Sequence, residues 1–149
     1  MSEIKDTVMA DIKACMKSGD KARLGVLRLI SSAVKQREVD ERVDTDDTAM
    51  IAILDKMAKQ RRESIEQFTT ANRTDLADAE VIELEIIKGY LPAQLSDEEV
   101  SALVDKAVAD TGASSVRDMG KVMGILKPQL QGRADMSAVS AQIKTRLNA

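Results

Sequence analysis

Two glycines and three cations recur at helical spacing between residues 116 and 127. At roughly 100° per residue, Gly120 and Gly124 share one face of a helix, and Arg117, Lys121 and Lys127 border them. Glycine inside a helix costs roughly 1 kcal/mol relative to alanine, so a pair on one face indicates that something approaches closely. A strip without side chains, bordered by positive charge, is suited to binding a phosphate or a polypeptide backbone.

A neighbouring helix would account for the same strip, and composition alone favours such packing over contact with a ligand. Glycines that face away from one core often seat another helix, and lysines beside them are then only solvated. The spacing leaves both alternatives open. A nucleotide-binding P-loop is excluded, because Val122 stands where Ser or Thr would hold Mg²⁺ and Ser115 stands where the first glycine is needed.

The opposite side of this stretch is apolar and is expected to face a core. It is formed by Val116, Met119, Val122, Met123, Leu126 and Leu130. Pro128 would clash with the carbonyl of Gly124 inside a helix, so the helix is expected to end or kink near Leu126. A turn over residues 129–133 should follow, and Ser114 or Ser115 should cap the start of the helix.

Charge is distributed unevenly along the 149 residues. The net charge is −3, yet from residue 112 onward six Lys and Arg oppose two Asp, which gives +4 there and −7 before it. Only Phe68 and Tyr90 are aromatic, so the core must be aliphatic, which favours helices packed on helices. The fold class predicted is all-α, with a basic module following an acidic body.

Groups for catalysis or metal binding are scarce in this sequence. Histidine is absent, the single Cys15 is expected to be a small buried hydrophobe, and the carboxylates form no convergent pair. The acidic stretch over residues 40–47 lacks the ligand spacing of an EF-hand and is expected to be a solvated connector. We therefore expect no catalytic residues, metal site, cofactor or independent catalysis.

The first segment carries acidic residues, which transit peptides usually lack. Glu3, Asp6 and Asp11 lie in it, and no apolar run reaches membrane length. These features predict a cytoplasmic protein with no membrane partner.

Hydrophobic periodicity predicts helices over residues 3–17, 21–39, 48–70, 75–91, 96–111, 116–126 and from 135 onward. Pro92 and the capping box of Ser96 and Glu99 mark a boundary. We expect an N-terminal bundle of about four helices over residues 1–91, followed by a three-helix module over residues 96–149.

Four stretches together resemble the GatB/YqeY family. They are residues 27–35 (LRLISSAVK), 89–96 (GYLPAQLS), 119–128 (MGKVMGILKP) and 132–135 (GRAD). The resemblance implies an all-helical protein whose last module is similar to the tail of the tRNA-dependent amidotransferase B subunit. That carbon–nitrogen ligase amidates mischarged Glu-tRNA or Asp-tRNA with glutamine-derived ammonia, and its tail helps hold the tRNA. Its catalytic domain has no counterpart here.

The resemblance carries over to individual residues only in the last module. Its positions match Gly120, Lys121, Gly124, Lys127, Gly132 and Arg133. Gln129, Gln131 and Met136 depart from residues common in the family, which weakens the affinity that the resemblance implies.

Two functions follow from these observations. The first is an accessory protein that binds tRNA or another structured RNA through Arg117 and the six matching residues, with an amidotransferase or aminoacyl-tRNA synthetase as a further partner. The alternative is a protein-interaction adaptor in which the Gly120/Gly124 strip receives a partner helix.

Overall fold

The computed structural model describes residues 2–148, and all regular structure within them is helical. This confirms the all-α prediction. The chain separates into two compact units, Met1–Pro92 and Ala93–Ala149, each with its own core.

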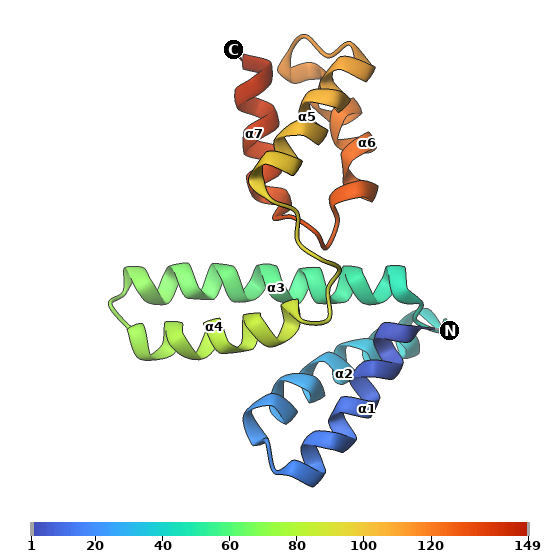
Figure 1. Ribbon diagram of the computed structural model, residues 1–149, viewed down its shortest axis with the longest axis vertical. Helices are drawn as coiled ribbons and strands as arrows, with labels where there is room; N and C mark the ends of the chain where they lie inside the picture. The colour runs from blue at the N-terminus through green and yellow to red at the C-terminus, as the bar shows by residue number, and fades with distance from the viewer. Residues whose placement is uncertain (1, 149) are drawn as a thin grey trace. The chain divides into compact units, whose positions relative to one another are not determined.

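Unit 1 consists of two helical hairpins, which Figure 1 shows in blue and in green. The first hairpin pairs α1 (Glu3–Ser18) with α2 (Lys21–Glu41), and the second pairs α3 (Asp47–Thr70) with α4 (Thr74–Lys88). The turn between α1 and α2 is tight because Gly19 adopts a left-handed φ of 77° and Asp20 accepts a hydrogen bond from the backbone N–H of Arg23.

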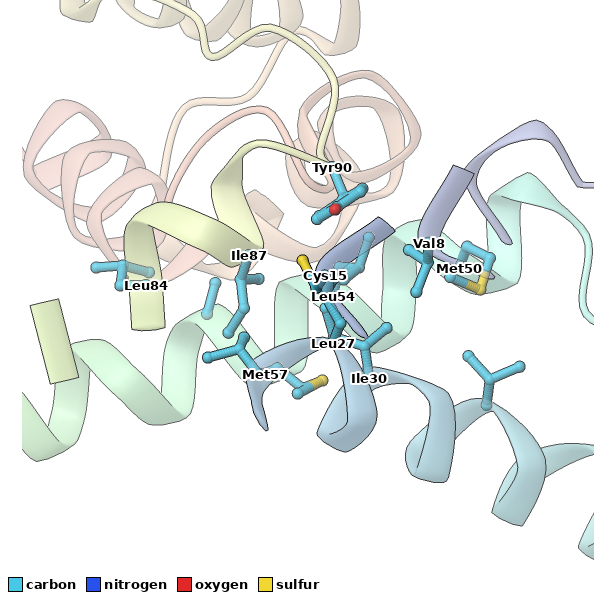
Figure 2. Close-up of a cluster of buried hydrophobic side chains, with 13 residues drawn as sticks. Val8, Cys15, Leu27, Ile30, Met50, Leu54, Met57, Leu84, Ile87 and Tyr90 are labelled. Carbon is cyan, nitrogen blue, oxygen red and sulfur yellow. The ribbon is translucent and has the colours of Figure 1, made fainter. Parts of the chain in front are cut away.

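The core of unit 1 is aliphatic, as the composition predicts, and Figure 2 shows its side chains converging from all four helices. Cys15 is buried within it, which confirms its expected role as a small hydrophobe. The fully buried members include Leu27, Ile30, Met50, Leu54 and Ile87.

The acidic connector differs from its prediction, because it is partly folded onto the unit. α2 continues to Glu41, and Thr45 is buried with its backbone N–H donating to Glu38. Asp46 caps α3, while Asp47 accepts hydrogen bonds from Ser2 Oγ and the N–H of Ile4. These carboxylates are acceptors for backbone and hydroxyl groups, so they are not simply solvated.

Unit 2 packs α5 (Asp97–Thr111), the 3₁₀ turn η1 (Val116–Asp118), α6 (Met119–Leu130) and α7 (Met136–Asn148) around a second core. The predicted capping box starts α5, since Ser96 Oγ accepts from the N–H of Glu99 and the Glu99 carboxylate accepts from the N–H of Ser96.

Two helix ends differ from the sequence prediction. α4 stops at Lys88, before the expected end at residue 91, because Gly89 closes its last turn and Pro92 disfavours helix at the preceding residue. α6 continues through Pro128 to Leu130, where an end or a kink near Leu126 was expected, so the helix does not end there. Leu130 is fully buried, and the burial of this side chain offsets the one hydrogen bond that the proline removes.

Candidate nucleic-acid interface

A carboxylate holds the segment that precedes α6, while no side-chain hydrogen bond caps α6 itself, so the serine cap that the sequence suggested is absent. Ser115 precedes η1 but its side chain makes no capping hydrogen bond. Asp118 Oδ2 instead accepts from the N–H of Ser114 at 3.0 Å. This backbone hydrogen bond, assisted by the charge of Lys121, lowers the pKa of Asp118, so the carboxylate stays ionised and fixes the backbone that carries Arg117.

One side of α6 is buried and the other is open. Val122, Leu126 and Leu130 are fully buried in the unit 2 core, whereas Gly120 and Gly124 are exposed. A Cβ built on either glycine would meet no atom within 4 Å. None of the described residues of unit 2 therefore packs on the strip, and the glycines are not explained by a neighbouring helix of this unit.

Three exposed cations border the open strip, as the helical spacing predicted. Arg117, Lys121 and Lys127 are all exposed. Within residues 2–148 their side chains form no hydrogen bond or ion pair. Four of the seven predicted site residues thus lie on α6 at helical spacing, and Arg117 is exposed on η1 directly before it. We call these five residues the α6 basic strip: Arg117, Gly120, Lys121, Gly124 and Lys127.

The other two predicted site residues have a structural role. Gly132 is buried with a φ of 77°, and its carbonyl oxygen accepts a hydrogen bond from Gln94 Nε2 at 2.7 Å. The carbonyl of Arg133 accepts from the N–H of Leu95 at 2.9 Å, and Arg133 Nε donates to the carbonyl of Ala93 at 3.5 Å. These bonds attach the segment before α5 to the turn between α6 and α7.

The sequence contained a signal for this role, since both segments belong to the stretches that carry the family resemblance. Nothing in either stretch alone indicates that it pairs with the other, because 38 residues separate Gln94 from Gly132. Through their carbonyl oxygens, Gly132 and Arg133 hold the turn that follows α6. They therefore affect the α6 basic strip only through this turn.

The residues that the structure describes contain neither a metal-binding cluster nor a membrane-spanning helix. No group of three or more His, Cys, Asp or Glu side chains in residues 2–148 is arranged to hold a metal ion. In the same range, no helix combines the length and the apolar character needed to cross a bilayer.

Comparisons with known proteins identify relatives along most of the chain. The profile of the family described as Yqey-like protein matches residues 5–147. A protein of Pyrenophora tritici-repentis named "Altered inheritance of mitochondria protein 41, mitochondrial" is 30% identical over 141 residues, covering 92% of this chain and 77% of the relative. A protein of the same name from Lachancea thermotolerans is 33% identical over 141 residues, covering 89% and 75%.

These relatives overturn the cytoplasmic prediction, because they and a third from Kluyveromyces lactis are named as mitochondrial proteins. The acidic residues on which that prediction rested have structural roles in α1. Asp11 accepts a hydrogen bond from Tyr90, and Glu3 and Asp6 lie in the first turn, where negative charge favours the helix. These acidic residues stabilise α1, so their presence is not evidence for a cytoplasmic location. By the match over residues 5–147, the chain belongs to the YqeY-like protein family.

Proposed function

We propose that this protein binds structured RNA, with tRNA as the first choice, through the α6 basic strip. One observation carries the proposal. Within the described part of unit 2 the strip is bare and uncovered, and its three cations form no hydrogen bond or ion pair there. Two helical glycines at this place destabilise α6 without serving the core, which is explained if a phosphate backbone approaches them.

The charges set how such binding would behave. Each Lys or Arg that neutralises a phosphate releases a condensed counterion, so affinity falls as salt rises by about 0.7 to 0.9 logarithmic units per contact per tenfold increase in salt. Three contacts from Arg117, Lys121 and Lys127 correspond to a slope of about −2 to −3. Cations of this kind contribute affinity and orientation and do not read sequence.

The composition of unit 2 favours folded RNA over single strands. Phe68 and Tyr90 both lie in unit 1, so unit 2 has no aromatic ring on which an unpaired base could stack. Recognition would then depend on the shape and phosphates of a folded RNA. The similarity of this unit to the amidotransferase tail supports tRNA, and we extend the proposal to an accessory role beside an amidotransferase or aminoacyl-tRNA synthetase.

The test is a fluorescence-anisotropy titration of labelled tRNA at several salt concentrations, with duplex DNA as competitor. We expect salt-dependent binding that resists the DNA and is lost in Lys121→Glu/Lys127→Glu. The matched control is Lys59→Glu/Lys106→Glu, which changes the net charge equally at exposed positions outside the strip. Equal loss in both double variants, or no loss in the first, contradicts the proposal.

The adaptor alternative predicts a different response from the same strip. Gly124→Leu should abolish binding of a partner helix, and Lys121→Ala should leave that binding unchanged. RNA binding should be weakened by both substitutions. No RNA binding at low salt, together with this pattern for a protein partner, would favour the adaptor.

A further inference from the structure

A small cavity lies in unit 1 and is lined by residues of α1, α2 and α3. Its volume is about 150 Å³. Val8, Val34 and Met50 line its base and are almost completely buried, and Figure 2 shows Val8 and Met50 adjacent in the core. Polar and flexible side chains complete its walls: Lys5, Met9, Ser31, Lys35 and Glu38. The cavity therefore combines an apolar base with a charged rim.

Two of the rim charges neutralise each other. Lys5 Nζ donates to Glu38 Oε1 at 2.5 Å, and the same oxygen accepts from the N–H of Thr45 at 3.2 Å. The hydrogen bond from Lys5 is the main cause that lowers the pKa of Glu38, so this carboxylate remains ionised at neutral pH. The pair contributes no net charge to the cavity.

The remaining polar groups are donors without a strong acceptor. Lys35 is exposed and has no hydrogen bond or ion pair within residues 2–148. The hydroxyl of Ser31 has one contact, to Met9 Sδ at 4.0 Å, which is at the limit for a sulfur acceptor. The two residues are four apart on α2 and so share one face, which leaves the cavity with one net positive charge beside a hydroxyl.

We propose that this cavity binds a small apolar carboxylate. An apolar cavity of about 150 Å³ in another protein holds one benzene molecule, so a single ring or a short branched chain fits the base here, and a long acyl chain does not. The carboxylate then pairs with Lys35 Nζ and accepts from Ser31 Oγ. The site lies in unit 1 and is independent of the RNA proposal. It includes Ser31, Val34 and Lys35 of the residue 27–35 stretch, to which RNA binding through unit 2 gives no role.

Methionine methyl groups offer a direct readout of this site. Met9 and Met50 line the cavity, whereas Met119, Met123 and Met136 belong to unit 2 and serve as internal controls. In the full chain labelled with ¹³C at the methionine methyls, we expect benzoate to shift the Met9 and Met50 signals saturably and to leave the three controls unchanged. Acetate, which has the carboxylate without an apolar body, should not saturate over the same range.

Three comparisons test the carboxylate and the cavity separately. Benzamide, which has nearly the same shape without the charge, should bind about two- to fivefold more weakly than benzoate. Lys35→Ala should remove that difference, whereas Lys13→Ala, which replaces an exposed lysine of α1 outside the cavity, should preserve it. Ser31→Leu should fill the cavity mouth and abolish the saturable shifts.

Two results would overturn the proposal. Non-saturable benzoate shifts, or shifts of equal size at the unit 2 methionines, would show that the cavity takes no ligand of this class. Equal affinity for benzoate and benzamide in the unmodified protein would show that Lys35 does not select a carboxylate.

Discussion

The side-chain amide of Gln94 donates a hydrogen bond to the carbonyl oxygen of Gly132 at 2.7 Å and joins two segments that are 38 residues apart. The N–H of Leu95 adds a second bond, to the carbonyl of Arg133 at 2.9 Å. Both bonds lie within unit 2. Residues 93–95 are therefore part of the folded unit and not of a free linker, and the turn that follows α6 depends on them.

Gly132→Ala should destabilise unit 2 by about 1 to 2 kcal/mol. Gly132 has a φ of 77°, and a Cβ in this left-handed region clashes with the adjacent carbonyl. Gln94→Ala should cost about 0.5 to 1.5 kcal/mol through the lost hydrogen bond. Urea unfolding followed by unit 2 amide signals measures both, with exposed Gln129→Ala as the control. Unchanged stability in Gly132→Ala would contradict the role given to this turn.

Tyr90→Phe should destabilise unit 1 by about 1 to 3 kcal/mol at neutral pH. The Tyr90 hydroxyl donates to Asp11 Oδ2 at 2.5 Å and accepts from Arg23 Nη2 at 2.9 Å. It therefore links α1 and α2 to the segment that follows α4. The variant removes both hydrogen bonds while the ring stays buried. Urea unfolding at pH 7 tests this, and a loss below experimental error would contradict it.

Ionisation of the same hydroxyl should make the stability of unit 1 depend on pH in the alkaline range. Burial, followed by the hydrogen bond to Asp11, raises the pKa of Tyr90 to about 12, above the unfolded value of about 10. The folded state therefore holds this proton more tightly, and its contribution is complete below about pH 10 and is lost as the pH rises toward about 12. That contribution is roughly 2 to 3 kcal/mol.

The measurement is the difference in unfolding free energy between the unmodified protein and Tyr90→Phe from about pH 8 to pH 11. The difference should shrink as the pH rises, because the variant has no phenol to titrate. Tyr90 is the chain's one tyrosine, so an ultraviolet absorbance titration reports its pKa directly. A midpoint near that of free tyrosine would exclude the hydrogen-bonded arrangement.

Local spacing was enough to predict the helices and the capping box of α5, but not the start of α6, where the expected serine cap is absent. The Ser96–Glu99 box, the Gly19 turn and the apolar face of α6 all depend on residues within about eight positions of one another. Such interactions are encoded by helical period and side-chain chemistry alone. The same reasoning placed Gly120, Lys121, Gly124 and Lys127 on α6, whereas Arg117 lies in the 3₁₀ turn η1 before it.

Interactions between distant segments could not be read from the sequence. The Asp47 carboxylate meets Ser2 across 45 residues, and Gly132 meets Gln94 across 38. In both cases a residue that the sequence suggested was free to contact solvent or ligand makes a hydrogen bond to a distant segment of the chain. Hydrogen-bond partners of this kind depend on how helices pack, which local period does not specify, and the unit 1 cavity was missed for the same reason.

Arg61→Ala should destabilise unit 1 by about 1 to 3 kcal/mol, between the values typical of exposed and buried ion pairs. Arg61 Nε on α3 lies 2.8 Å from Glu83 Oε2 and 3.6 Å from Glu80 Oε2 on α4, and its side chain is only 15% exposed. Without the guanidinium, two carboxylates remain close together with no cation between them. Urea unfolding with exposed Lys59→Ala as control tests this, and equal effects of the two variants would contradict it.

Gly120→Ala and Gly124→Ala should each stabilise unit 2 and weaken RNA binding. A Cβ at either position meets no atom within 4 Å, so alanine fits and each variant gains up to about 1 kcal/mol of helix stability. The same methyl group occupies the space in which a phosphate backbone would lie beside Lys121, so affinity for tRNA should fall. Leucine at either position should lower the affinity further.

Stability from urea unfolding and affinity from anisotropy should thus change in opposite directions, which a general folding defect cannot produce. If both alanine variants gain stability and bind tRNA as tightly as the unmodified protein, close approach to the glycines is not needed. Binding would then depend on the cations alone, and the cost of two glycines in α6 would require another partner, for which a helix seated on the strip is the arrangement to test.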